Sequence, residues 1–244
     1  MNEFLPRVTL DWHKTLETVL AYAQRAGRKG IVVFDLDSTV FDNRPRQARI
    51  VREYARSKNL SVLAGCQSWH FESGWDLKLA ALACGVVEAE YEPHARPLKA
   101  FWSQRFFTSD YCADDVEIVG APRYLHAIAH TGARVFYVTG RHEAMRAGTV
   151  ACLAKCGMPL PEGDSVVLLM KPTLQEGDDE YKRVAHGQLK KAGTVLAVFD
   201  NEPNHINDYA LMFPEALAVH LATDHSGRTS HLEPRVVSIP HFAW

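Results

Sequence analysis

The stretch Ile31-Val32-Val33-Phe34-Asp35-Leu36-Asp37-Ser38-Thr39-Val40 runs four apolar residues directly into two aspartates. An uninterrupted apolar run of this length is typical of a strand that is buried on both faces of a parallel sheet. In an extended backbone Asp35 and Asp37 point to one side and Leu36 points to the other. The sequence therefore predicts two carboxylates side by side at the carboxyl end of a buried strand, where open α/β sheets bind their ligands.

Two carboxylates held this close repel each other unless a cation lies near them or one of them keeps its proton. The pair therefore predicts either a bound metal ion or a raised pKa. An Asp-x-Asp pair alone is also common in polar loops that follow strands. Further elements of the chain have to decide whether this pair forms a functional site or only a polar loop.

Two later apolar runs also end in polar residues. Residues 135–138 lead into Thr139, and residues 195–199 lead into Asp200. Two lysines of interest lie between these runs, Lys171 and Lys182. The alternation of strands and helices in this part of the chain predicts a doubly wound parallel sheet, which is an α/β fold.

The order Asp-x-Asp-x-Thr, strand–Thr, Lys and strand–Asp resembles the haloacid dehalogenase superfamily. The resemblance covers the core, about residues 29–42 and 120–220. It implies a Rossmann-like sheet with a cap domain inserted after the first motif. It also implies the phosphatase branch, because the dehalogenase branch has no second Asp at the position of Asp37 and the pumping ATPases carry Thr there.

The length of 244 residues allows a core with an inserted module. Residues 44–118 show several helical patterns and few strand-like alternations, so we predict a mostly α-helical cap domain there. Residues 1–43 and 119–244 then form the α/β core domain. Within the cap, Pro93 and Pro97 predict a helix boundary. Other expected core elements are helices over residues 10–28, 122–131 and 179–191, and strands over residues 165–170, 216–221 and 236–239.

The resemblance also implies roles for individual residues. Asp35 is expected to attack phosphorus and form an aspartyl-phosphate, with Asp37 as the general acid and base. Mg²⁺ would be held by Asp35, by Asp37 through its main-chain carbonyl, and by Asp200. Thr139 and the backbone N–H groups near Gly140 would bind the remaining phosphate oxygens.

The superfamily also uses a lysine to neutralise charge around the first aspartate, and two candidates stay open. Lys171 ends a strand in Met-Lys-Pro, as in many relatives. Lys182 lies in the first turn of the next helix, as in some acid-phosphatase relatives. The spacing to Asp200 is long from Lys171 and short from Lys182. We favour Lys182 and keep Lys171 as the alternative.

The sequence departs from the superfamily pattern after Asp200. Many relatives have a further acid next to this residue or four positions on, where this chain has Asn201 and Asn204. We expect these two amides to lie around the metal ligands, so that the metal shell carries less negative charge. Glu202 is the alternative acid.

The start of the predicted cap is basic, with six Arg and Lys residues against the single acid Glu53 between positions 44 and 58. One interpretation is a solvated, charged helix face. The other is that Arg44 and Arg46 help to hold an anionic substrate, since arginine forks suit phosphate. Arg141, next to Gly140, is a further candidate for substrate binding.

The composition excludes several classes of partner. The chain has 27 basic and 29 acidic residues and a net charge of −2, so nothing favours nucleic acid or an anionic membrane. The start shows no signal segment, and no apolar run is long enough to span a bilayer. Five scattered cysteines suit free thiols, and we expect a cytoplasmic protein.

The leading prediction is a Mg²⁺-dependent phosphatase that acts on a small phosphomonoester. A phosphomutase or another phosphotransferase would reuse the aspartyl-phosphate on Asp35 with a different acceptor. A binding or regulatory protein could keep the fold without turnover, although the set Asp35, Asp37, Thr139 and Asp200 argues against it. The sequence names neither the substrate nor the oligomeric state.

Overall fold

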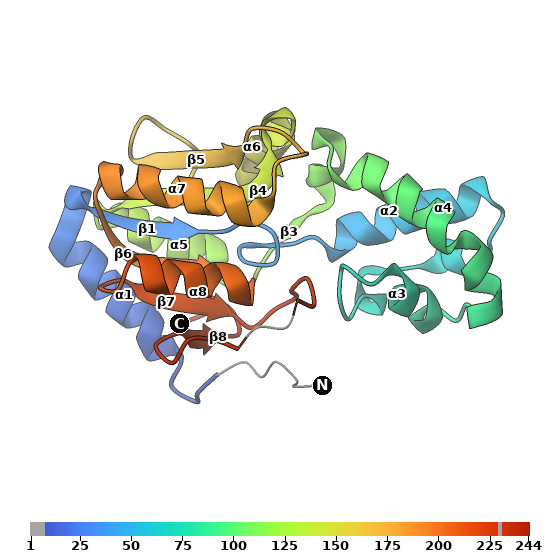
Figure 1. Cartoon of the computed structure of the whole chain (residues 1–244), viewed down its shortest axis with the longest axis horizontal. Helices are drawn as coiled ribbons and strands as arrows, with labels where there is room; N and C mark the ends of the chain where they lie inside the picture. The colour runs from blue at the N-terminus through green and yellow to red at the C-terminus, as the bar shows by residue number, and fades with distance from the viewer. Residues whose placement is uncertain (1–7, 229–230) are drawn as a thin grey trace.

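A six-stranded parallel sheet forms the centre of the computed structural model, which describes residues 8–228 and 231–244 (Figure 1). The strand order is β5-β4-β1-β6-β7-β8, and every pairing is parallel. The predicted fold class, a doubly wound parallel sheet, is confirmed. The strands are β1 (Gly30–Phe34), β4 (Arg134–His142), β5 (Val166–Lys171), β6 (Thr194–Asp200), β7 (Leu217–Leu221) and β8 (Val237–Ile239).

Helices cover both faces of this sheet (Figure 1). One face packs against α1 (His13–Ala26), α5 (Ala121–His130) and α6 (Arg146–Lys155). The other face packs against α7 (Asp178–Ala192) and α8 (Pro203–Met212). The predicted elements of the core are therefore present, with ends shifted by a few residues.

The strand β1 lies in the middle of the sheet and is buried on both faces. Val32 and Phe34 belong to the core beneath α1 and α5, whereas Ile31 and Val33 belong to the core beneath α7 and α8. None of these four side chains has exposed surface. Full burial of such a side chain is worth about 1.5–3 kcal/mol, so this strand holds the two aspartates on a rigid base.

The chain leaves the sheet after β1 and returns before β4. The short strands β2 (Phe41–Asp42) and β3 (Val116–Glu117) pair antiparallel where it leaves and returns. The helices between them are α2 (Arg44–Ser57), α3 (Leu77–Ala83) and α4 (Glu88–Phe106), which stand beside the sheet and enclose a hydrophobic cluster of their own (Figure 1). Short 3₁₀ turns complete the chain: η1 (Gly27–Lys29), η2 (Leu63–Gly65), η3 (Ser68–His70), η4 (Ser109–Asp114) and η5 (Glu143–Met145).

The predicted helix boundary at Pro93 and Pro97 is wrong, because α4 runs through both prolines. Proline removes one hydrogen bond of the helix and often ends or kinks it. Both prolines are exposed, so they lie on the side of α4 that faces away from its buried residues. The opposite side buries Tyr91, Leu98 and Trp102, and this burial outweighs the local cost.

The structure also describes the cysteines and the apolar character of the helices. The five cysteines are free thiols, as the sequence predicts. Over residues 8–228 and 231–244, none of the helices combines the length and the apolar character that crossing a membrane requires.

Candidate active site

The turn after β1 carries both aspartates into one pocket. The main-chain N–H of Asp35 donates to the carbonyl of Phe199 (2.9 Å), which extends the β1–β6 pairing by one residue. The chain then turns at Ser38, whose φ is 57°, and the N–H of Ser38 donates to the carbonyl of Phe41 (2.7 Å). Asp35 and Asp37 line the same pocket, as the alternation of side chains predicts.

This pocket has a volume of about 440 Å³ and lies between the carboxyl ends of the central strands and the helical insertion. The insertion contributes the aromatic residues Trp75, Phe106 and Phe107. The predicted site residues that line the pocket are Asp35, Asp37, Arg46, Thr139, Gly140, Arg141, Lys182 and Asn201. Four other predicted residues are not among its lining residues: Arg44, Lys171, Asp200 and Asn204.

Lys182 lies between two carboxylates at the base of the pocket. Its Nζ is 2.7 Å from Asp35 Oδ1 and 2.6 Å from Asp200 Oδ2, and all three side chains are almost fully buried. The Nζ of Lys171 is instead 2.6 Å from Asp178 Oδ1. Of the two predicted lysines, the structure therefore places Lys182 at the first aspartate and directs Lys171 elsewhere.

One lysine does not balance the two carboxylates. Burial raises the pKa of Asp35, and the charges of Asp200 and Asp37 raise it further, although Lys182 opposes them. Despite burial, Lys182 and the neighbouring His205 hold the pKa of Asp200 well below its usual range. The remaining negative charge favours an additional cation at this position.

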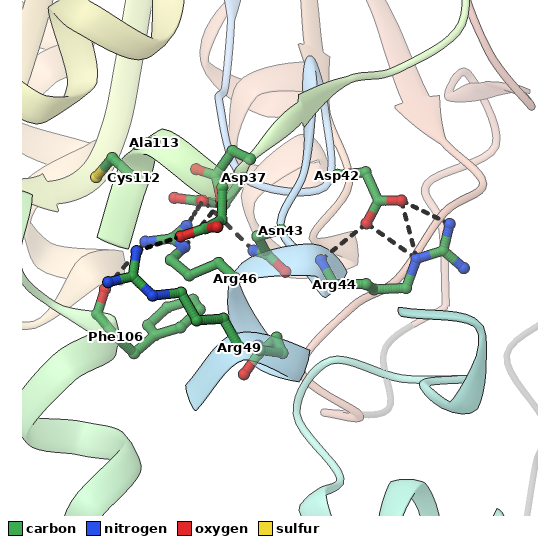
Figure 2. A network of polar contacts seen from close by, with 12 residues as sticks. Asp37, Asp42, Asn43, Arg44, Arg46, Arg49, Phe106, Cys112 and Ala113 are labelled. Carbon is green, nitrogen blue, oxygen red and sulfur yellow. Dashed lines mark hydrogen bonds and ion pairs between the residues drawn. The ribbon is translucent and has the colours of Figure 1, made fainter. Parts of the chain in front are cut away.

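Asp37 is held by two arginines. Arg141 donates from Nε to Asp37 Oδ2 (2.9 Å) and from Nη2 to Oδ1 (2.7 Å), and Arg46 donates from Nη2 to Oδ1 (2.7 Å). Both guanidinium groups also contact Asp115, at 2.9 Å from Arg46 and 2.6 Å from Arg141. Figure 2 shows Arg46 between Asp37 and Phe106, whose carbonyl accepts a further hydrogen bond (3.0 Å). The four charged side chains form a closed ring.

The ring joins both connections between the insertion and the core. Arg46 lies at the start of α2, Asp115 on the returning segment, and Arg141 on β4. Arg46 and Asp115 have no exposed side-chain surface. Burial opposes ionisation of Asp37, but Arg141 and Arg46 outweigh it and hold the pKa of this carboxyl well below its usual range. Asp37 is therefore ionised at neutral pH in this arrangement.

The arginines predicted to hold the substrate have other partners. Arg44 pairs with Asp42 (2.7 Å) outside the pocket. Arg46 lines the pocket but is fully buried in the ring, so it belongs neither to a solvated helix face nor to free phosphate-binding groups. Arg141 also lines the pocket with its nitrogens already bound to protein groups. The physical reason is Asp115, an acid far along the chain that the basic segment does not reveal.

Thr139 and Gly140 shape the side of the pocket formed by β4. The Oγ1 of Thr139 accepts a hydrogen bond from the N–H of Arg141 (3.1 Å). A Cβ atom on Gly140 would lie 3.0 Å from the carboxyl group of Asp178. Gly140 therefore allows the first turn of α7 to approach β4 closely, which brings Lys182 over the aspartates.

The amide of Asn201 supports the turn after β1. Its Oδ1 accepts a hydrogen bond from the hydroxyl of Thr39 (3.1 Å), and its Nδ2 donates to the carbonyl of Asp224 (2.6 Å). The alternative acid Glu202 is also engaged, because its carboxylate accepts from the N–H (2.6 Å) and the hydroxyl (2.9 Å) of Ser226. Both side chains therefore already hold protein groups in place.

No protein-family model matches this chain, and no curated protein matches it. Several solved structures do match this chain. A candidate phosphatase from Clostridium difficile is 11% identical with a TM-score of 0.51, and the match covers 87% of this chain and 94% of that one. Protein Tyrosine Kinase A of Mycobacterium tuberculosis is 17% identical with a TM-score of 0.50, over 88% and 95% of the two chains.

A candidate haloacid dehalogenase-like hydrolase from Bacteroides fragilis is 14% identical with a TM-score of 0.49, over 85% and 95% of the two chains. The chain shares its α/β fold with the Clostridium difficile and Mycobacterium tuberculosis proteins. At these identities the likeness establishes the fold alone. The chemistry has to be argued from the side chains at the carboxyl ends of the strands.

Several residues at this site were not selected from the sequence. They are Asp115, Asp178, Asp179, His205 and Arg228. The acidic run before β3 and a histidine soon after Asp200 are the signals that could have indicated Asp115 and His205. No spacing signal points to the contact between Asp179 and Arg228, because the two residues are 49 positions apart.

The donor set fits the divalent cation that the resemblance of the sequence implies. Carboxylate oxygens are the ligands that Mg²⁺ prefers, and Asp35 and Asp200 share a single lysine. Among the described residues, the Nδ1 atom of His205 is buried without a hydrogen-bond partner. A bound cation would give this nitrogen a partner for its lone pair and would offset the excess negative charge of the carboxylates.

Proposed function

We propose that the protein is a metal-dependent phosphomonoesterase that forms an aspartyl-phosphate on Asp35. The observation that supports this proposal best is the contact of Lys182 with Asp35 and Asp200 at the carboxyl ends of β1 and β6. It unites the nucleophile, the charge partner and the third acid predicted from the sequence. Thr139 lines the same pocket, where its hydroxyl would donate a hydrogen bond to a phosphate oxygen.

In the first step a carboxylate oxygen of Asp35 bonds to phosphorus, and the bond from phosphorus to the leaving oxygen breaks with its electron pair. Lys182 holds Asp35 in position and offsets charge that accumulates on the transferred group. When bound, Mg²⁺ on Asp35, Asp200 and the carbonyl of Asp37 would supply further charge neutralisation.

In the second step Asp37 takes a proton from a water molecule whose oxygen bonds to phosphorus. The bond from phosphorus to the Asp35 oxygen breaks, which regenerates the carboxylate and releases inorganic phosphate. The two arginines of Asp37 keep it ionised but also make it a weaker base, so this role requires that the bound phosphate draws a guanidinium group away from Asp37. Proton donation to the leaving group needs the protonated form of Asp37. A bound phosphate dianion therefore has to compete with Asp37 for the guanidinium of Arg141, which lies beside Gly140 on the pocket wall.

The size and lining of the pocket indicate the kind of substrate. A volume of about 440 Å³ suits a small molecule, and Trp75, Phe106 and Phe107 close it from the side of the insertion. A small phosphomonoester fits this space, with its phosphate toward Asp35 and its organic part toward the aromatic residues.

Release of p-nitrophenol from p-nitrophenyl phosphate tests the proposal. We expect hydrolysis with Mg²⁺, loss of at least about a hundredfold after chelation with EDTA, and recovery when Mg²⁺ is added back. Glycerol as a second acceptor tests the phosphotransferase alternative, because a transferase forms glycerol phosphate in preference to free phosphate. A folded protein with no turnover of any phosphate ester, or with activity that chelation does not change, would contradict the proposal.

The two lysines should respond very differently to truncation. Lys182→Ala leaves two buried carboxylates without their cation, so we expect a loss of about 3–5 kcal/mol in the free energy of unfolding. We also expect kcat to fall by more than about a hundredfold. Lys171→Ala is the matched control, because Lys171 is as buried as Lys182 but pairs with the half-exposed Asp178, so its truncation leaves no buried carboxylate unpaired and should cost clearly less. Similar losses in both variants would contradict the assignment of Lys182.

A further inference from the structure

One ring nitrogen of His205 faces the carboxyl group of Asp200 across a distance that is too long for a hydrogen bond. This histidine lies in the first turn of α8, lines the pocket, and has only 5% of its surface exposed. Among the described residues, its Nδ1 atom has no hydrogen-bond partner, and it is 3.8 Å from Asp200 Oδ1. We propose that Nδ1 of His205 is a further ligand of the divalent cation at this site, an inference that rests on the proposed metal-dependent function.

The contact on the other side of the ring sets the tautomer. The Nε2 atom is 2.8 Å from Asp179 Oδ1, and an ionised carboxylate only accepts hydrogen bonds. Nε2 therefore carries a hydrogen and donates it, which allows Nδ1 to keep its lone pair. Asp179 is in turn held by Arg228, at 2.8 Å and 3.1 Å, and this hydrogen bonding lowers the pKa of Asp179 to about 2.

A carboxylate that accepts from one ring nitrogen while the other faces a cation is the usual support of a metal-binding histidine. The separation between Nδ1 and Asp200 Oδ1 also suits a shared ion. Two ligand atoms about 2.1 Å from one metal lie about 3–4 Å apart, depending on whether they are adjacent or opposite. The observed 3.8 Å falls in this span.

The competing arrangement is a doubly protonated ring that pairs with Asp179 and Asp200. Burial and Lys182 oppose this charge, but the two carboxylates outweigh them and raise the pKa of His205. The distance from Nδ1 to Asp200 is nevertheless too long for a hydrogen bond. A proton and a metal ion would compete for the same lone pair, so direct detection of a metal–nitrogen bond decides between them.

The neighbouring residues leave this role open. Asn201 and Glu202 bind protein groups with their oxygens, and Asn204 does not line the pocket. His205 differs from them, because its Nδ1 atom faces Asp200 and has no hydrogen-bond partner among the described residues. An imidazole nitrogen is a softer ligand than oxygen and favours Mn²⁺ or Co²⁺ over Mg²⁺. The site should thus bind Mn²⁺ more tightly than a site built from oxygens alone.

Mn²⁺ binding by the purified full chain tests the inference without reference to activity. Electron paramagnetic resonance counts free Mn²⁺ in a titration, and pulsed measurements detect nitrogen coupled to the bound ion. We expect a nitrogen coupling in the unaltered protein and none in His205→Ala. We also expect His205→Ala to weaken Mn²⁺ at least about tenfold and Mg²⁺ less than about threefold.

His126→Ala is the matched control, because this histidine lies on α5 with its Nε2 bound to the carbonyl of Gly157 (3.1 Å). It should keep both the coupling and the affinity. Mn²⁺ bound without nitrogen coupling, or equal Mn²⁺ affinity in His205→Ala, would overturn the assignment of His205 while leaving the proposed function intact. Absence of any Mn²⁺ or Mg²⁺ binding would overturn the assignment and the proposed metal dependence together.

Discussion

Asp35→Asn is expected to lower the turnover of phosphomonoesters by more than about a thousandfold, which corresponds to more than about 4 kcal/mol. The reason is that an amide oxygen is a poor nucleophile and cannot form the aspartyl-phosphate. Single-turnover release of p-nitrophenol, with the protein in excess, measures the chemical step directly. Activity like that of the unaltered protein would contradict the covalent mechanism.

The same variant should keep its stability. Burial and neighbouring carboxylates raise the pKa of Asp35, which means that the fold disfavours its ionised form at neutral pH. The linkage has a definite sign: a carboxyl whose pKa is raised by folding makes the protein less stable above the unfolded pKa. A neutral amide removes this cost while its oxygen still accepts a hydrogen bond from Lys182. We therefore expect a thermal midpoint equal to or above that of the unaltered protein, measured by circular dichroism.

Asp115→Ala is expected to lower the free energy of unfolding by about 3–5 kcal/mol, because it removes one partner from a buried ion-pair network. The side chain of Asp115 has no exposed surface, and it contacts Arg46 and Arg141, which are also buried. Without it, two buried guanidinium groups share Asp37 as their remaining carboxylate. Urea unfolding followed by fluorescence measures the loss.

Asp114→Ala is the matched control for this prediction. Asp114 pairs with Arg49 at 2.7 Å, and its side chain is 31% exposed. Such a partly exposed pair is worth about 0–1 kcal/mol. If the two neighbouring aspartates prove equally costly to remove, the ring around Asp37 does not stabilise the fold as we infer.

Local signals were sufficient for the sheet and for the first motif. The apolar run before Asp35 predicted a central strand because burial on two faces leaves no polar position in it. Helical spacing likewise predicted helices between residues 44 and 118, where α2, α3 and α4 lie, although Pro93 and Pro97 misled the placement of a helix end. That error arose because a proline's effect depends on whether its side of the helix meets water or the core.

The choice between the two lysines lay beyond any local signal. Spacing to Asp200 argued weakly for Lys182, yet the decision depended on how α7 packs across β1 and β6. Tyr181, Ala185 and Leu189 bury the inner side of α7 against the sheet, and this packing directs Lys182 toward the aspartates. Lys171 lies at the end of β5, two strands away from β1 in the sheet order.

The sequence by itself determined the residue types and the order of the motifs, because strand burial, helical period and neighbouring carboxylates are properties of adjacent positions. Only the tertiary structure decided which charges meet. Asp35 contacts a lysine 147 positions away, and His205 contacts an aspartate 26 positions away. Contacts of this kind depend on how helices pack on the sheet, and electrostatic energy depends on distance in space rather than along the chain.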